Sequence, residues 1–410
     1  MKKLLLVLLI LSLFINHLNA NEKDLQIIQK DKKEYRLLDK ESIQTRQQSQ
    51  KYDWISPIDL SGNIGRNHSF SDENSRNLNN KNTKSASIGF TQSIFESGGI
   101  GFKMDYADNR FKYEMLSWEN QNSQLIYTIY NTLLDIKKLK LEINQNEYRI
   151  VNKDIELIIK KIQYEAGKTD IIELNNAIMS KNLILKEEIA LKNSLKEKEQ
   201  ELAKYTDLKY DEIEILDFQE TNKDIFLDKN YSILEADAKV EMLNSEYKIK
   251  KSQYLPKLSL SAKASYSNQD EKFNSMINDT NKDDASSSGS LILSMPLYDY
   301  TKSSKIQESK IEVLKQKALV NDLKNETAFE YEQIFTKIDT YLKQNETINK
   351  NIKLYEELIG ANKISSEAGM TSKYDLEILE NTKTINEFDI LINKINILQQ
   401  YAKLYFKIKN

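Results

Sequence analysis

Two stretches, "YEAGKTDIIELNNA" (164–177) and "SEAGMTSKYDLEIL" (366–379), share one skeleton: Glu-Ala-Gly and, six residues after the glycine, an acid followed by leucine. Gly167 and Gly369 lie 202 positions apart (369 minus 167), about half of the 410-residue chain. Each copy interrupts a long segment with helical periodicity. Because glycine ends a helix in the left-handed conformation at little cost, each copy is predicted to be the tip of a helical hairpin.

The segments that lead into the two tips contain no proline and carry apolar residues every seven positions, the spacing of a coiled-coil seam. They run from about Met104 to Glu165 and from about Lys302 to Ala368, and about sixty residues at 1.5 Å each predict rods of about 90 Å. Return helices are expected over about 170–205 and 372–407, capped by Thr169 in the first copy and by Thr371 or Ser372 in the second. The seam residues are Ile129, Ile136, Ile143, Ile150, Leu157 and Tyr164, then Ile334, Tyr341, Ile348 and Tyr355, and after the second tip Leu391, Leu398 and Tyr405.

Short alternating segments surround the only prolines of the chain, Pro57, Pro256 and Pro296, which mark strand boundaries. In "SPIDLSGNIGRN" (56–67) and "LPKLSLSAKASYS" (255–267), apolar residues alternate with small polar ones, which predicts strands. Second strands are expected from Ser85 and from Ser288, so that β-hairpins span 56–96 and 257–298, each with a long polar loop.

This alternation fits either a half-buried sheet in water or a sheet that faces lipid. Four strands make a poor isolated core and are too few to close a barrel. A membrane location therefore requires several chains to share one barrel.

Composition excludes several functional classes. The chain has no cysteine, and of its two histidines His17 lies in an expected signal peptide (1–20), while His68 lies in a polar loop. The chain has too few histidines and no cysteine for a catalytic triad or a multi-histidine metal site. No enzyme, cofactor or metal is therefore expected. The 59 basic and 62 acidic residues form no long block of one sign, which argues against a nucleic-acid partner.

The predicted elements occur twice, about 200 residues apart, which indicates a tandem duplication. We expect a signal peptide (1–20), a first repeat (21–205) with a tip near 166–170, a linker (206–222) and a second repeat (223–410) with a tip near 368–372.

In this order the elements resemble those of the TolC-like outer-membrane efflux protein family, over essentially the whole mature chain. The resemblance implies a mainly α fold with membrane β-structure: a homotrimer in which each chain gives four strands to a twelve-stranded outer-membrane barrel and long antiparallel helices to a periplasmic tunnel. It further implies a passive exit duct for efflux or type I secretion that works with a periplasmic adaptor protein and an inner-membrane transporter. The alternative is a secreted coiled-coil filament or adhesin, which would use the same heptads but would not need four amphipathic strands.

The resemblance also assigns residues to two roles. Those expected to meet the adaptor are Ala166, Gly167, Lys168, Ala368, Gly369 and Met370, in which the glycines match the family's Val-Gly-Leu-like tip and their neighbours match it only in part. Glu173 and Asp375 correspond to acids that line the closed aperture. A further acid often found three residues later is replaced by Asn176 and Ile378.

Overall fold

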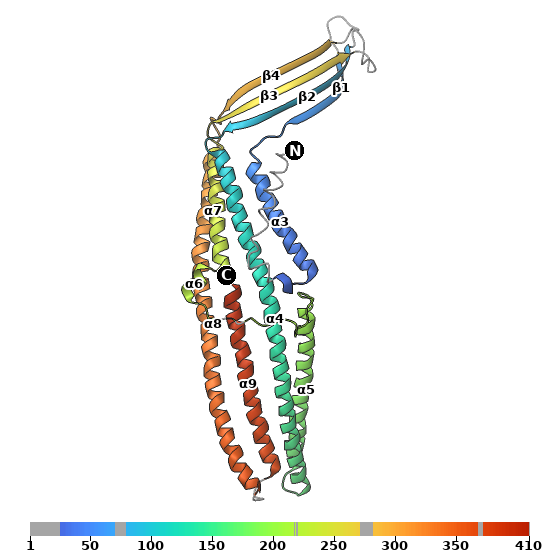
Figure 1. The fold of residues 1–410 in the computed structure, drawn as a ribbon, viewed down its shortest axis with the longest axis vertical. Coiled ribbons are helices and arrows are strands. Elements are labelled where there is room, and N and C mark those ends of the chain that lie inside the picture. Colours follow the sequence, from blue (N-terminus) through green and yellow to red (C-terminus); the bar gives the residue numbers. More distant parts are fainter. Residues whose placement is uncertain are drawn as a thin grey trace, which may run out of the picture. The chain divides into compact units, whose positions relative to one another are not determined.

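The computed structural model describes residues 25–69, 79–216, 218, 220–270, 282–367 and 372–409. The expected signal peptide and the predicted second-tip residues Ala368, Gly369 and Met370 lie outside these ranges. The chain divides into two compact units, which are drawn together in Figure 1. Unit 1 contains residues 1–40, 116–234 and 321–410, and unit 2 contains 41–115 and 235–320.

Unit 1 is built from long helices that lie side by side in the order α5, α4, α9, α8 (Figure 1). The bounds are α4 (Gly99–Glu165), α5 (Ile171–Leu202), α8 (Lys302–Glu367) and α9 (Lys373–Phe406), of which α4 and α8 begin in unit 2. Side-chain hydrogen bonds join α4 to both of its neighbours, α5 and α9. Asn146 on α4 donates to the carbonyl of Ile184 on α5 (3.2 Å). On the other side of α4, Gln145 donates to Asp389 on α9 (2.6 Å).

The predicted seam is buried on α4 at Ile129, Ile136 and Ile143, and on α8 at Ile334. Ile129 and Ile136 are fully buried, whereas Tyr164 on α4 and Leu391 on α9 are about two-fifths exposed. Within the chain, the predicted seam is therefore not buried at these two side chains. A single layer of helices covers only part of each helix surface, so apolar side chains outside the shared contact remain exposed.

Helix α6 (Lys223–Asp228) and the residues that follow it pack against the C-terminal end of α9 in unit 1. This short helix places Phe226 in a cluster with Ile334, Ile338, Leu404 and Ile408. The chain after α9 pairs with residues 229–231, where Lys409 N–H donates to the carbonyl of Lys229 (2.8 Å) and Tyr231 N–H to that of Lys407 (2.9 Å).

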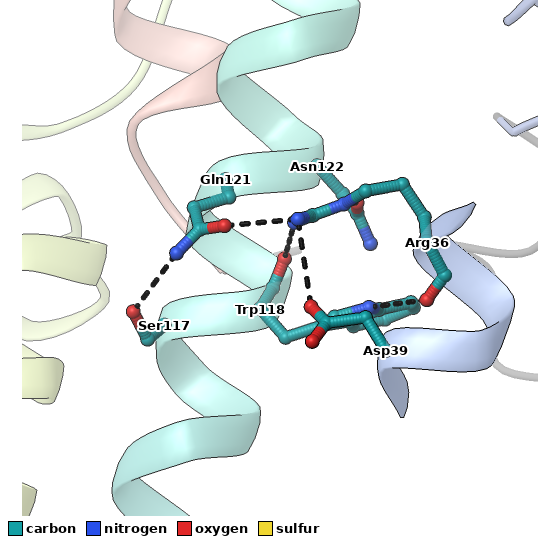
Figure 2. Close-up of polar contacts among 6 residues, drawn as sticks. All are labelled: Arg36, Asp39, Ser117, Trp118, Gln121 and Asn122. Atoms are coloured by element: carbon teal, nitrogen blue, oxygen red, sulfur yellow. Dashed lines mark hydrogen bonds and ion pairs between the residues drawn. The ribbon is translucent and has the colours of Figure 1, made fainter. Parts of the chain in front are cut away.

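Helix α3 (Lys30–Tyr52), which follows a short 3-10 turn (Leu25–Ile27), is held to α4 in unit 1 by a buried arginine (Figure 2). The Arg36 guanidinium donates to Asn122 Oδ1 (2.6 Å), Gln121 Oε1 (2.9 Å) and the carbonyl of Trp118 (3.1 Å). Trp118 Nε1–H donates back to the carbonyl of Arg36 (2.8 Å), so the two helices exchange hydrogen bonds. Asp39 lies 3.6 Å from the guanidinium.

Unit 2 contains one antiparallel sheet in the order β1-β2-β3-β4. The strands are β1 (Asp59–Ser69), β2 (Asn79–Phe95), β3 (Lys257–Asp270) and β4 (Lys282–Ser294), and α7 (Tyr231–Ser252) leads into β3. The two predicted hairpins join through β2 and β3, which pair from Asn82–Asp270 to Phe95–Leu258. Strands β2 and β4 begin six residues earlier than predicted, because backbone pairing continues through polar residues that lack the alternating apolar signal.

The predicted fold class, mainly helical with four strands, is confirmed. Within the described ranges, none of the helices is sufficiently long and apolar to cross a membrane.

Candidate functional site

The first predicted tip is a complete glycine-terminated helix end. Gly167 has φ +67°, its N–H donates to the carbonyl of Tyr164 (2.9 Å), and Lys168 N–H donates to that of Gln163 (2.8 Å). These two bonds are those of a Schellman motif, which satisfies carbonyls that a helix end otherwise leaves open. A Cβ added to Gly167 would have no heavy atom within 4 Å. Only the backbone conformation therefore requires glycine, and the surface of the tip is open: Ala166, Gly167 and Lys168 are all exposed.

Helix α5 begins on an acid rather than on the predicted threonine. Asp170 is the N-cap of α5, and its Oδ1 accepts from Glu173 N–H (2.9 Å). The expectation that Thr169 caps this helix was wrong, because Asp170 follows it in extended backbone with a side chain that reaches Glu173. In the second copy Ser372 caps α9, as predicted, and its Oγ accepts from Tyr374 N–H (3.2 Å).

The two predicted aperture acids have different surroundings. Both lie in the first turn of a helix, where the macrodipole favours negative charge. Glu173 Oε2 accepts from Lys160 Nζ on α4 (3.1 Å), so its charge is partly compensated within the same hairpin. Asp375 is exposed, and in the part of the chain that the structure describes its carboxylate has neither a hydrogen bond nor an ion pair. Their role as aperture acids stays a prediction.

The sheet of unit 2 has one face rich in hydroxyl groups. Pairs of hydroxyls contact each other across neighbouring strands: Ser61 and Ser87 at 2.8 Å, Thr91 and Ser261 at 3.0 Å, and Ser265 and Ser286 at 2.8 Å. Asp59 and Lys263 flank Gly89 in the register on this same face. A Cβ at Gly89 would lie 3.0 Å from the carbonyl oxygen of Ala262 and 3.3 Å from Cγ of Lys263, so glycine allows both the backbone of β3 and the lysine stem to lie close to β2.

The opposite face of the sheet is apolar and open. Leu60 is 79% exposed and Leu293 is 73% exposed, and Leu60 belongs to the alternating set that predicted β1. In the register they share the face with Ile88 and Ala264. Exposed apolar side chains in such number on one face indicate a surface that is covered in the functional state, either by lipid or by another chain.

Sequence reasoning missed two polar residues near the first tip, Asp170 and Lys160. Asp170 carried a signal, since an acid three residues before Glu173 at the start of an apolar run is close to the capping-box pattern. Lys160 carried none, because its contact with Glu173 depends on the angle between α4 and α5. Within the described ranges, no three histidine, aspartate or glutamate side chains meet as a metal-binding group.

Comparison with protein families finds a match for the second half of the chain. Residues 224–403 match the model of a family described as outer membrane efflux protein. The family resemblance inferred from the sequence is thereby confirmed. No curated protein matches the chain.

Several solved structures share the fold at low sequence identity. The outer membrane protein VceC of Vibrio cholerae has a TM-score of 0.73 at 12% identity, with 94% of this chain and 93% of that chain covered. The CmeC outer membrane channel of Campylobacter jejuni has a TM-score of 0.70 at 12% identity, covering 92% and 84%. The MtrE outer membrane channel of Neisseria gonorrhoeae, solved in its open state, has a TM-score of 0.67 at 12% identity, covering 94% and 87%.

Proposed function

We infer that the chain is one subunit of a trimeric outer-membrane efflux channel, a passive exit duct of a tripartite efflux or type I secretion system. The observation that carries this proposal is the open sheet. Strands β1 and β4 each pair on one side only within the described sheet, so both edges present unpaired backbone groups next to an exposed apolar face. Unprotected edges of this kind promote association with another strand, and closure into a barrel removes them.

The two faces of the sheet fit the two environments of a barrel wall. The hydroxyl-rich face suits a water-filled lumen, and the apolar face suits lipid. Four strands per chain and three chains give twelve strands, within the range of outer-membrane barrels. The outer-membrane location predicted from the sequence agrees with the description of the matched family.

The helical layer of unit 1 supports association in the same way. Apolar side chains on α5 that are mostly exposed include Ile172 (64% exposed) and Ile189 (69% exposed). Three such layers placed edge to edge would cover these side chains and form a tunnel. The proposed tunnel is a passive conduit through which an inner-membrane transporter drives the cargo.

The tips are the proposed docking surface for a periplasmic adaptor. Ala166, Gly167 and Lys168 present a rigid, exposed turn, because the Schellman bonds fix the backbone and leave the side chains free. Ala368, Gly369 and Met370 would have the corresponding role in the second hairpin. Just beyond the tips, Glu173 and Asp375 are the proposed aperture acids.

Disulfide trapping tests the shared barrel, since the chain has no cysteine of its own. Cysteine would replace Ser61 on β1 and, one at a time, Ser286, Ser288 or Ser290 on β4. If β1 of one copy meets β4 of the next, at least one pair gives a covalent trimer in the outer-membrane fraction under oxidising conditions. The control replaces Ser87 instead of Ser61, because central strand β2 cannot reach β4 of another copy.

The proposal fails if none of the edge pairs forms a covalent trimer, or if the purified chain is a monomer without detergent. Covalent fibres in place of trimers would support the coiled-coil filament.

A further inference from the structure

The hydroxyl-rich face of the sheet contains a hollow of about 420 Å³ that a passive conduit does not require. Its lining includes Asp59, Ser61, Ser87, Gly89, Thr91, Ser261 and Lys263. Gly89 lies at its centre, because Asp59 pairs with Gly89 in the register and Gly89 pairs with Lys263. Strands β1, β2 and β3 therefore all contribute to the hollow, and the middle strand has no side chain at this level.

Two opposite charges flank the glycine. Asp59 and Lys263 are both exposed, and among the described residues neither has a hydrogen bond or an ion pair. Neighbouring strands lie about 4.8 Å apart, so the Cα atoms of Asp59 and Lys263, which are two strands apart, are separated by roughly 10 Å. The Lys263 stem lies close to β2, with its Cγ 3.3 Å from the position of a Cβ on Gly89. A small molecule above the glycine can thus contact both charges.

The residues that adjoin this pair on the same face of the paired strands are uncharged. Across, along and diagonal to the pair, they are Ser61, Ser87, Gly89, Thr91, Ser261, Ser265, Ser286, Ser288 and Ser290. The next charged residue of β3 on this face is Lys257, six positions from Lys263. On β4 it is Asp284, four positions from the serine that pairs with Lys263. At about 3.4 Å per residue, both lie farther from Asp59 and Lys263 than these two lie from each other.

Hydroxyl pairs border the hollow beside the two charges. Ser61 contacts Ser87 at 2.8 Å, and Thr91 contacts Ser261 at 3.0 Å. Because a hydroxyl both donates and accepts hydrogen bonds, these pairs suit the N–H and C=O groups of a peptide that lies across the hollow. In the proposed channel this face lines the lumen, so the hollow lies on the path of the cargo.

We propose that Asp59 and Lys263 bind short zwitterionic peptides in the lumen. The Asp59 carboxylate accepts from the terminal ammonium group, and the Lys263 ammonium group donates to the terminal carboxylate. Charge-assisted hydrogen bonds at both ends orient the peptide, and Gly89 leaves room for its backbone. A solute with charge of only one sign is attracted by one of the two residues and repelled by the other. The inference rests on the proposed function, which puts this face in the lumen.

Protection of a single cysteine from alkylation tests the site, because the chain has no cysteine of its own. Ser87→Cys introduces a thiol into the hollow of the full-length protein. Its reaction with neutral iodoacetamide is timed in detergent at pH 7 with increasing concentrations of trialanine, whose two termini are then charged. Bound trialanine is expected to slow the reaction. Trialanine with an acetylated N-terminus and an amidated C-terminus carries no charge and should leave the rate unchanged.

Further variants in the Ser87→Cys background separate the two charges from charge in general. Asp59→Asn or Lys263→Gln should each raise the trialanine concentration for half protection by about threefold, which is within the range of exposed ion pairs. Asp59→Lys combined with Lys263→Asp should restore protection, because the peptide can then bind in the opposite direction, and this rescue excludes misfolding as the cause. The matched controls Asp284→Asn and Lys257→Gln remove an acid and a cation from the same face outside the hollow and should change nothing.

The inference is overturned if the uncharged peptide protects the thiol as trialanine does, or if protection is unaffected by Asp59→Asn and by Lys263→Gln. It is also overturned if either control variant weakens protection equally. The β1–β4 disulfide trimer reports separately on the proposed function. Protection without the trimer would contradict the channel, whereas a trimer without protection would contradict only the peptide site.

Discussion

At the scale of single residues, Arg36 is the side chain on which the attachment of α3 to α4 depends most. It is 9% exposed, and burial lowers the pKa of its guanidinium from the usual value while leaving it charged at neutral pH. Its three acceptors lie on one face of α4 (Figure 2). A buried charge is tolerated only when its donors are satisfied, and here the forked geometry of arginine allows this.

Replacing Arg36 by methionine should lower the free energy of unfolding by about 2–4 kcal/mol, since buried acceptors on Trp118 and Asn122 lose their donor. Arg46→Met is the matched control. Arg46 lies on the same helix and contacts both oxygens of Glu114 at 3.0 Å, but it is 43% exposed. An exposed pair contributes at most about 1 kcal/mol. Thermal unfolding followed by circular dichroism in detergent measures both variants, and equal losses would contradict the role assigned to Arg36.

No sequence signal identified Arg36, and the reason is physical. Its partners lie 82 to 86 positions away, and on α3 it is one of several basic residues in a polar helix. The tip glycines are different, because a helix end and its φ above zero are local requirements that a short motif can encode. Local features of the candidate site could therefore be predicted, whereas contacts between helices could not.

At the scale of helices, the contact between α8 and α9 includes an acid held by two lysines. Glu330 accepts from Lys403 at 2.7 Å and from Lys407 at 2.5 Å. Burial by itself raises the pKa of Glu330, but the hydrogen bonds from the two lysines outweigh it, so the pKa lies below its usual value. The ionised form is thus favoured in the folded chain relative to the unfolded chain.

Because the pKa is lowered on folding, this contribution is fully present above the unfolded pKa of about 4.3 and is lost as the pH falls through the folded pKa. Glu330→Gln should therefore lower the melting temperature at pH 7, by an amount equivalent to about 1–3 kcal/mol, and have little effect near pH 3. Asp339→Asn removes an exposed pair with Lys343 on the same helix and serves as the control. A difference between wild type and Glu330→Gln that stays constant from pH 7 to pH 3 would contradict this account.

At the scale of the whole molecule, the internal repeat allowed the order of the elements to be predicted from the sequence. Each repeat predicts one hairpin of strands and one of helices, and the described elements follow that order. The joining of β2 to β3 could not be predicted, because it pairs residues some 170 positions apart through backbone groups that every sequence has. The number of copies in the assembly also cannot be predicted from the pattern of one chain. Unpaired edges and exposed apolar faces indicate only that copies associate, and the number three comes from the family resemblance.

In the proposed trimer, the two candidate aperture acids differ in how strongly they would attract cations at the narrow end. Three copies of Asp375 would form a ring of uncompensated carboxylates, which attracts divalent cations. Glu173 is partly neutralised by Lys160, and its ring would be weaker. In single-channel recordings, Asp375→Asn should therefore relieve block by periplasmic divalent cations, Glu173→Gln should relieve it less, and Lys160→Gln should strengthen it by releasing Glu173.

The opposing explanation is that both acids only stabilise helix starts, which is worth about 0.3–1 kcal/mol each through the macrodipole. That explanation predicts a lower melting temperature for Asp375→Asn with unchanged block and conductance, and no effect of Lys160→Gln on either property. The response to Lys160→Gln distinguishes most clearly between the carboxylate ring and the helix-start explanation, because Lys160 lies on α4, away from any helix start. Stronger block in Lys160→Gln that disappears when Glu173→Gln is combined with it would support a Glu173 carboxylate that faces the path of the ions, because removal of the Lys160 charge alone would act without Glu173.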